Sequence, residues 1–380
     1  MKICAVICEY NPFHNGHLYQ LNEAKHLSGA DAVLCIMSGN FVQRGEAAVA
    51  DKFTRAKHAV WGGADVVIEL PTIFATSNAE LFAKGAISIL SSIPAVTTLC
   101  FGVEMNDKAA LLQAATLLNK EPQEISQKIK ALTAEGMSYA KARATAWQDL
   151  LPTEILTSPN NILGLEYTRA ILEQNANIDI LPIKRLGGGY NDTALNEPFS
   201  SASAIRAAIS TKENVKNALP DFVLGDLPQA LTDKLDCLEK YALLSRAEEE
   251  IAKVCDCTEG LENAFKKAAL LDAPLVESLT SARYTSARIR RIALQNLLKI
   301  DETLIRQSLQ SSLYLRVLAV KKSSIDALSA LSAANLPIIA RAHDEEVLSD
   351  TAKLAFEVDR FAERIYNLLY PSLNNRTIFV

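Results

Sequence analysis

The sequence predicts an α/β protein in which a Rossmann-like parallel sheet is followed by an all-α region. Over residues 1–217, short apolar runs alternate with helical patterns, the rhythm of a parallel sheet covered by helices. Over residues 218–380, Leu, Ala and Ile recur at helical spacing and strand signals stop. A hydrophobic content of 49%, with only 13 Pro and 15 Gly, indicates a substantial core. We therefore expect two domains, 1–217 and 218–380.

The elements of the first domain follow from its apolar runs and the residues that interrupt them. Asn11-Pro12 ends the first strand, Gly62-Gly63 ends a helix, and Pro71 stops a third strand. The expected strands lie at residues 3–7, 32–37, 64–70, 97–101 and 177–183. The expected helices begin near residue 15 and cover 53–61, 79–90, much of 107–150, and a segment after residue 200.

Polar segments follow several of these strands at the edge where parallel sheets bind ligands. The segments at this edge are Glu9 to His17, Ser38 to Glu46, Leu70 to Pro71, and Gly102 to Glu104. Ligands of open α/β sheets bind outside the carboxyl ends of the strands. We therefore expect the functional site at this edge.

The first of these segments contains a His-x-Gly-His turn at the start of a helix. His14 and His17 are three residues apart and share one helical face. Free backbone N–H groups at a helix start favour phosphate, and Gly16 allows a ligand to approach the backbone. Two alternatives stay open: a metal site, for which no third ligand is evident nearby, and an ordinary helix start. The turn favours nucleotide chemistry.

A second phosphate-binding candidate is Ser201-x-Ser203-x-x-Arg206. Hydroxyl groups at a helix start can donate to phosphate oxygens, and Arg206 offers a forked guanidinium one turn later. The alternative is simple capping of the helix by serine. Together with the histidine turn, this segment indicates a triphosphate site.

The two segments together resemble the HxGH nucleotidyltransferase superfamily. In that superfamily, two histidines and a distal serine- and arginine-containing segment stabilise charge on the phosphates during adenylyl transfer. Longer tracts resemble the bacterial tRNA(Met) cytidine acetate ligases in particular. These tracts are residues 9–17, 38–46, 51–57, 158–164 and 183–185, with Arg283-Tyr284-Thr285 and residues 288–291.

This resemblance implies an enzyme that uses ATP and acetate to form N4-acetylcytidine at the wobble base of elongator tRNA(Met). It implies catalytic roles for His14, His17, Ser201, Ser203 and Arg206. It also implies ATP contacts from the following residues: Ile7, Cys8, Glu9, Tyr10, Asn11, Pro12, Phe13, His14, Asn15, Gly16, His17, Gly102, Asn161, Arg185 and Leu186. We expect Mg2+ to accompany ATP, held by phosphates and water, and no metal site made by the protein itself.

Contacts to tRNA are expected from two groups of basic residues. Arg44, Lys52 and Arg55 follow a strand end and could receive a tRNA phosphate or the acetate carboxylate. The second group lies in the predicted helical domain and consists of Arg283, Arg288, Arg290 and Arg291. The alternative for this second group is a solvated charged face.

Composition limits the remaining choices. The net charge of -5 requires any nucleic-acid contact to come from a local basic surface. Seven irregularly spaced Cys, several in apolar runs, indicate reduced thiols in a cytoplasmic protein. We expect no signal peptide, because the first strand begins at once, and no membrane span. Two other functions stay open: adenylylation of a small phosphorylated metabolite, and non-catalytic RNA binding.

Overall fold

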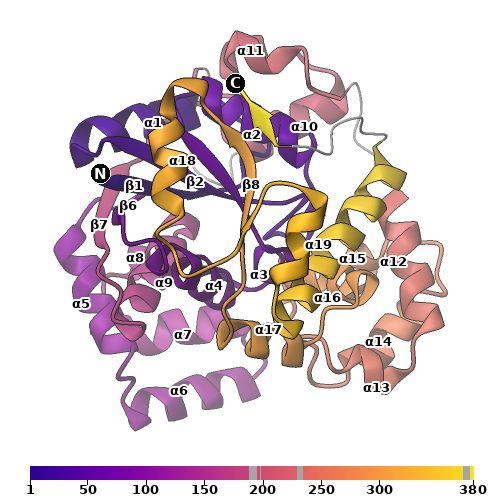
Figure 1. Cartoon of the computed structure of the whole chain (residues 1–380). Helices are drawn as coiled ribbons and strands as arrows, with labels where there is room; N and C mark the ends of the chain where they lie inside the picture. Colours follow the sequence, from indigo (N-terminus) through magenta and orange to yellow (C-terminus); the bar gives the residue numbers. More distant parts are fainter. Residues whose placement is uncertain (188–194, 197, 229–233, 371–376) are drawn as a thin grey trace.

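A computed structural model describes residues 1–187, 195–196, 198–228, 234–370 and 377–380 (Figure 1). Its centre is an eight-stranded sheet, and a short hairpin of two further strands lies beside it. The strands of the sheet are β1 (Ile3–Cys8), β2 (Ala32–Ser38), β5 (Val66–Leu70), β6 (Val96–Val103), β7 (Asp179–Lys184), β8 (Leu315–Val320), β9 (Ile338–Ile339) and β10 (Ile378–Phe379). The hairpin consists of β3 (Phe41–Val42) and β4 (Glu46–Ala47).

Helices account for most of the remaining described chain. In the first half they are α1 (Asn15–Ser28), α2 (Lys52–Trp61), α3 (Thr72–Ala75), α4 (Ala79–Ser91), α5 (Lys108–Leu118), α6 (Gln123–Ala134), α7 (Tyr139–Trp147), α8 (Thr153–Thr157), α9 (Pro159–Glu173) and α10 (Ala202–Thr211). In the second half they are α11 (Asp221–Leu224), α12 (Lys234–Ser245), α13 (Glu248–Ile251), α14 (Leu261–Ala268), α15 (Leu275–Leu279), α16 (Ser286–Leu298), α17 (Glu302–Leu309), α18 (Ile325–Leu331) and α19 (Asp350–Leu369).

The sheet has the strand order β10-β8-β5-β2-β1-β6-β7, with β9 paired to β8. Strands β5, β2, β1, β6 and β7 are mutually parallel, which confirms the predicted α/β fold class. Strand β8 runs antiparallel to β5, so that Arg316 stands opposite Glu69. The carboxyl ends of β1, β2 and β6 therefore share one edge with the beginning of β8.

The C-terminal part is mainly helical, as predicted, but our expectation that no strand follows residue 218 is wrong. Strands β8, β9 and β10 all come from this part and complete the sheet of the first. Five of the six residues of β8 are apolar, Arg316 being the exception, and a short run of this kind cannot be told from a buried helix segment by periodicity alone. The boundary between residues 217 and 218 stays a prediction.

Alternating side chains of the strands supply two cores, one on each face of the sheet. Ile3, Ala5 and Ile7 of β1 pack with residues of α4, α9 and α19. Cys4, Val6 and Cys8 of the same strand pack with residues of α1, α2 and α10. The polar loops at the carboxyl edge are thus held by elements that are anchored on both faces.

A third, smaller core lies within helices α12 to α16. Its largest buried members include Leu243, Ile251 and Phe265. In Figure 1 these helices form a lobe at the lower right, with α19 between the lobe and the sheet. No helix in the part of the chain that the structure describes is long and apolar enough to cross a membrane.

Candidate active site

The histidine turn joins β1 to α1 through a reciprocal pair of hydrogen bonds. His14 is the N-cap residue of α1, and its Nδ1 accepts from the backbone N–H of Gly16 at 3.0 Å. His17 Nδ1 accepts from the backbone N–H of His14 at 3.3 Å. The two imidazole rings stack with their centroids 3.6 Å apart. Side chains of the motif therefore cap the helix that the motif begins.

Both imidazoles are neutral at physiological pH. Burial, with added repulsion from Arg185 and Arg206, lowers the pKa of His14 from 6.5 to about 3. Burial, with repulsion from His14 and Arg185, lowers the pKa of His17 well below its ordinary value. Because each Nδ1 accepts a hydrogen bond, each ring carries its proton on Nε2. The turn thus holds two uncharged N–H donors.

Gly16 is required by the turn itself. A Cβ atom at this position would lie 2.9 Å from Cε1 of His14. Such a contact is closer than carbon atoms tolerate, so the capping imidazole accounts for the glycine. The sequence predicts glycine at position 16 because a ligand approaches the backbone there. The structure gives a second reason for this glycine, which is the lack of space beside the His14 ring.

Helix α10 brings the distal serine and arginine segment to the same place. Ser201 caps α10, its Oγ accepting from the backbone N–H of Ala204 at 3.0 Å, so the capping alternative holds for this residue. Arg206 donates to the carbonyl oxygen of Asn11 at 2.8 Å. Arg44 donates to Ser203 Oγ at 3.2 Å. The predicted proximity of the two segments is confirmed.

The two segments line one cavity of about 160 Å³ at the carboxyl edge of the sheet. Predicted site residues that line it are Ile7, Cys8, Glu9, Tyr10, Asn11, His14, His17, Arg44, Gly102, Arg185, Ser201, Ser203 and Arg206. A smaller adjoining cavity of about 30 Å³ is lined by Gly16 and Leu186, together with His14, His17 and Arg185. Most of the predicted ATP site is therefore contiguous.

Four predicted ATP contacts lie outside the larger cavity without bordering the smaller one. Phe13 is fully buried behind the turn, with its ring centroid 5.7 Å from that of His17. Asn15 donates to the carbonyl oxygens of Pro198 and Asn217, at 3.1 and 2.9 Å. Pro12 is buried and lines neither cavity.

Asn161 is the fourth, and its side chain is buried and makes three hydrogen bonds to the backbone. Its Oδ1 accepts from the backbone N–H groups of Glu104 and Met105, and its Nδ2 donates to the carbonyl oxygen of Glu154. Asn161 is 0% exposed and does not line the cavity, so in this structure the side chain does not reach the place where ATP is expected. Its neighbour Asn160 lines the cavity instead.

Lys52 and Arg55 do not reach the surface, so their predicted contact with tRNA is wrong. Lys52 is 1% exposed and pairs with Glu69 at 2.9 Å and Glu363 at 3.1 Å. Arg55 is fully buried and donates to backbone carbonyl oxygens, including those of Ala50 and Ser38. Both cations stabilise loops at the edge of the sheet.

Aromatic residues of the cavity were missed by the sequence analysis. Phe101 and Tyr167 line it with their ring centroids 5.7 Å apart. Phe101 belongs to an apolar strand, and Tyr167 to a helix with buried neighbours, so both resemble core residues in sequence. The position of Phe101 directly before Gly102 was the one available signal.

The role of Glu46 was also missed. Its carboxylate lies 3.5 Å from Arg206 and 3.1 Å from Arg290, which belongs to α16. Gly45, beside it, has φ +74°, and a Cβ atom there would lie 2.6 Å from the backbone of Arg290. The loop between β3 and β4 thus joins the candidate active site to the helical lobe.

The predicted basic strip of the lobe is partly neutralised. Arg283 pairs with Glu259 at 2.6 Å, and Arg291 lies 3.8 Å from Asp256. Arg288 donates to the carbonyl oxygen of Asp256 at 2.7 Å. A cavity of about 510 Å³ separates these arginines from α4, α7 and α9, and it is also lined by Arg143 and Arg169.

Metal ligands are sparse. The described residues contain no group of three or more His, Cys, Asp or Glu side chains that could hold an ion. Glu9 is the one carboxylate among the described residues that line the main cavity, and burial raises its pKa.

The fold and this site define a nucleotidyltransferase with paired histidines at the start of its first helix. A family model described as HIGH Nucleotidyl Transferase matches residues 1–378, and the chain belongs to this family. Relatives named tRNA(Met) cytidine acetate ligase align with this chain over almost its whole length. That of Caldanaerobacter subterraneus subsp. tengcongensis is 37% identical over 388 residues, covering 98% of this chain and 96% of the relative. That of Acetivibrio thermocellus is 35% identical over 400 residues, covering 98% and 96%.

Solved structures of Thermotoga maritima TmcAL have the same fold. The apo form aligns with a TM-score of 0.91 and 30% identity, covering 100% of both chains. The form bound with alpha-thio ATP aligns with a TM-score of 0.87 and 32% identity, covering 98% of this chain and 96% of the other.

Proposed function

We propose that this chain is an ATP-dependent ligase that forms N4-acetylcytidine at the wobble position of elongator tRNA(Met). The observation that carries the proposal is the single cavity in which the neutral donors of His14 and His17 face Arg206, Arg44 and Ser203. The names of its relatives, and the ATP analogue bound by the Thermotoga maritima protein, supply the substrates.

The chemistry has two steps. Cytosine N4 is a weak nucleophile because its lone pair is delocalised, and acetate is a weak electrophile. In the first step an acetate oxygen attacks the α-phosphorus of ATP, and pyrophosphate leaves. In the second step N4 attacks the carbonyl carbon of acetyl-adenylate, AMP leaves, and N4 loses a proton. The first step concentrates charge on the phosphates, where fixed donors stabilise the transition state most.

Each part of the cavity has a place in the first step. The Nε2–H groups of His14 and His17 would donate to the oxygens where the α- and β-phosphates meet. Arg206, Arg44 and Ser203 would hold the outer phosphates, for which forked guanidinium groups are suited. The aromatic side, formed by Phe101 and Tyr167, would pack against adenine.

Mg2+ would enter with ATP and neutralise part of its charge. The sparse carboxylates fit an ion held mainly by phosphates and water, because Mg2+ retains several waters in nucleotide sites. Glu9 is the side chain that could approach such an ion through water.

Transfer requires the protein to hold tRNA while N4 reaches the cavity. Arg44 at its rim and Arg283, Arg288, Arg290 and Arg291 of the lobe would contact the RNA backbone. Glu46, which pairs with Arg206 of the cavity and with Arg290 of the lobe, joins the cavity to the lobe.

The test is to incubate the protein with ATP, labelled acetate and unmodified elongator tRNA(Met), and to analyse the nucleosides by mass spectrometry. We expect N4-acetylcytidine, with AMP and pyrophosphate in equal amounts. A tRNA(Met) with uridine at the wobble position is the matched control and should gain no acetyl group. Adenylylation of a small metabolite, or tRNA binding without turnover, would contradict the proposal.

A further inference from the structure

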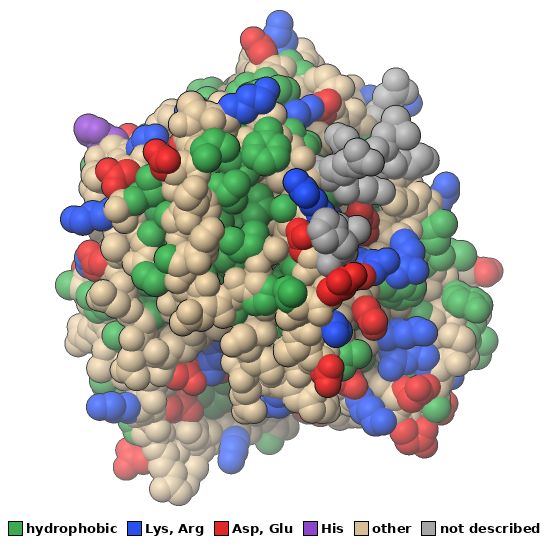
Figure 2. Space-filling model, in the orientation of Figure 1, with side chains coloured by type: hydrophobic (Ala, Val, Ile, Leu, Met, Phe, Trp, Pro, Cys, Tyr) green, Lys and Arg blue, Asp and Glu red, His purple; other side chains and the backbone are tan. Residues whose placement is uncertain are grey.

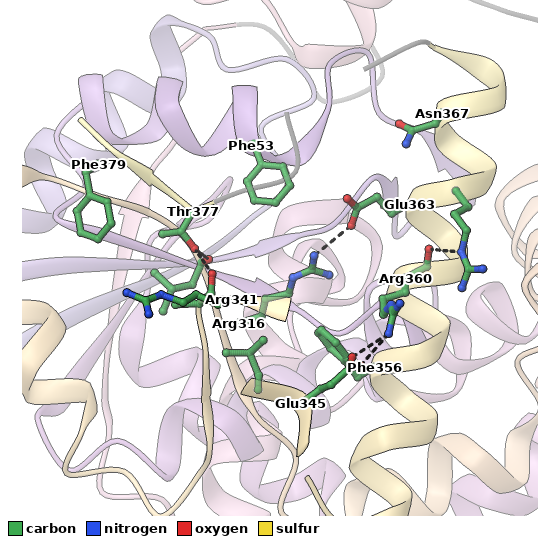
Figure 3. Close-up of a pocket in the computed structure, with 14 residues that line it drawn as sticks. Phe53, Arg316, Arg341, Glu345, Phe356, Arg360, Glu363, Asn367, Thr377 and Phe379 are labelled. Carbon is green, nitrogen blue, oxygen red and sulfur yellow. Dashed lines mark hydrogen bonds and ion pairs between the residues drawn. The ribbon is translucent and has the colours of Figure 1, made fainter. Parts of the chain in front are cut away.

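A further cavity, which shares no lining residue with the cavity of the histidine turn, lies between β8 and α19. Its volume is about 790 Å³, within the range of small-ligand sites. Figure 2 shows hydrophobic side chains gathered at the centre of the face that bears β8, with charged side chains along their right-hand border. Figure 3 shows the cavity itself, with side chains from β8, α19, Phe53 and the C-terminal strand around it.

Arginine is the dominant charged residue of this cavity. Four arginines line it, and two glutamates, Glu345 and Glu363, accompany them. Arg316 forms ion pairs with Glu69 at 3.2 Å and with Glu363 at 3.1 Å. Nη1 of Arg360 donates to both carboxylate oxygens of Glu345, at 3.0 and 2.9 Å. Both glutamates of the lining are therefore already paired, Glu345 with Arg360, and Glu363 with Arg316 and Lys52.

The other two arginines have no carboxylate partner. Among the residues that the structure describes, no Asp or Glu lies within 4.0 Å of the guanidinium nitrogens of Arg341 or Arg364. Both side chains are exposed at the surface yet line the cavity. A concave surface with two surplus guanidinium groups favours an anion, and phosphate matches their fork.

The remaining lining favours an apolar, planar group. Phe53, Phe356 and Phe379 border the cavity, and Arg316 already lies over the Phe356 ring, 5.2 Å from its centroid. Phe379 is 50% exposed, so one large aromatic surface is open. Asn367 Oδ1 is buried and has no hydrogen-bond partner among the described residues, which leaves an acceptor for an amino or hydroxyl group.

We propose that this cavity binds a nucleotide, with its phosphate on Arg341 and its base against Phe379, and that the neighbouring phosphate contacts Arg364, which lies on α19 together with Asn367. The proposal rests on the proposed function: the nucleotide belongs to the tRNA, at a position other than the reactive cytidine. A free mononucleotide has the same chemistry. Strands β8 and β1 are separated by β5 and β2, so the cavity lies roughly 15 Å along the sheet from the histidine turn.

The experiment measures tRNA affinity over a series of salt concentrations for Arg341→Gln, Arg364→Gln and Asn367→Asp. Lys353→Gln is the matched control, because Lys353 is an exposed cation of the same helix that does not line the cavity. Losing one phosphate contact lowers the slope of log affinity against log salt by about one. We expect that change, with several-fold weaker binding, for both arginine variants, and weaker binding for Asn367→Asp because its carboxylate repels phosphate.

Two further measurements complete the test. Acetyl-adenylate formation without tRNA should stay unchanged in all four variants. CMP binding is measured with the histidine site filled by an ATP analogue, and it distinguishes a nucleotide of the tRNA from a free mononucleotide. If the variants lose CMP binding but bind tRNA as before, the cavity binds a free nucleotide. If neither tRNA nor CMP binding differs from that of Lys353→Gln, the inference is overturned. Failure of the proposed function is seen separately, as absence of acetylcytidine with the unaltered protein.

Discussion

The imidazole of His14 caps helix α1 through Nδ1 and presents Nε2–H to the cavity. One side chain therefore caps the helix and, in the proposed function, also donates to ATP, and these two contributions can be separated. Asparagine is among the best N-cap residues, and its Oδ1 can accept from the Gly16 N–H as Nδ1 does. It has no group in the place of Nε2.

We predict that His14→Asn preserves stability and loses catalysis. Removing one preorganised donor costs about a hundredfold or more in kcat, roughly 3 kcal/mol. The expected result is an unfolding midpoint close to that of the unaltered protein, with acetyl-adenylate formation slowed by that factor. His26→Asn, at the exposed end of the same helix, is the control and should alter neither quantity. Equal activity of the two variants would show that Nε2 of His14 is not used.

The depressed pKa of His14 also predicts how stability depends on pH. The unfolded chain binds a proton at this imidazole below pH 6.5, whereas the folded chain does so only near pH 3. The free energy of unfolding therefore falls as the pH decreases through this window, by up to about 1.4 kcal/mol per pH unit for this group. Denaturant titrations between about pH 6 and pH 4 should show a shallower decline for His14→Asn. An identical decline would mean that the folded protein protonates this ring as readily as the unfolded one.

At the scale of elements, the sequence reveals strands that are flanked by breakers. Strands β1, β2 and β5 are apolar runs that end at a polar or proline-containing turn, so their existence was predictable. Strand β8 was not, because its apolar run lies among helices, and β9 and β10 are only two residues long. Pairing with β5, far away in the chain, decides the structure of β8.

The difference between local sequence signals and contacts that are distant in sequence also explains which site residues were predictable. His14, His17, Ser203 and Arg206 occur in two short motifs whose local spacing indicated one common site, and all four line the same cavity. Lys52 was misassigned, because its partners Glu69 and Glu363 come from β5 and α19. Burial produced by contacts so distant in sequence leaves no local pattern.

The ion pairs between α2, β5, β8 and α19 predict a large cost for removing a buried charge. Lys52→Met leaves Glu69 facing one cation fewer in a site that is 1% exposed. Breaking a buried pair costs about 3–5 kcal/mol. Lys25→Met is the matched control, since Lys25 is 48% exposed in its pair with Asp65 and such a pair contributes about 1 kcal/mol at most. Chemical denaturation measures both losses, and similar values would contradict the burial of Lys52.

At the scale of the molecule, the loop between β3 and β4 connects the sheet to the helical lobe. Gly45 has φ +74° and lies against the backbone of Arg290. Gly136 has φ +94° and no atom near its absent Cβ, so it isolates the conformational part of a glycine substitution. Comparing alanine substitutions at Gly45 and Gly136 therefore tests the contact between Gly45 and the backbone of Arg290.

We predict that Gly45→Ala impairs acetyl transfer more than Gly136→Ala. Both substitutions cost about 1–2 kcal/mol through the left-handed backbone, but only the first displaces the lobe. The expected result is slower formation of acetylcytidine from tRNA, with a smaller effect on acetyl-adenylate formation. The rates of acetyl-adenylate formation and of acetyl transfer to tRNA are measured in both variants. If Gly45→Ala slows both steps to the same extent, the lobe does not act in transfer.

The basic strip gives the corresponding prediction for RNA. Arg283→Gln should weaken tRNA binding several-fold and reduce its salt dependence, because Arg283 is exposed and can exchange Glu259 for phosphate. Arg306→Gln is the control, since Arg306 is also exposed and paired, with Glu302 of its own helix. Filter binding over a salt series provides the measurement. If Arg283→Gln binds tRNA as tightly as the unaltered protein does, Arg283 does not contact tRNA.

Strand β8 has a consequence for the order in which the protein is made. All the residues of the histidine turn and the Arg206 segment leave the ribosome before Leu315 is added. Until then the outer edge of β5 has no neighbouring strand, and an unpaired edge of this kind is a template for association with other chains. The nascent chain therefore contains the histidine turn and the Arg206 segment of the proposed active site long before it contains the strand that covers this edge.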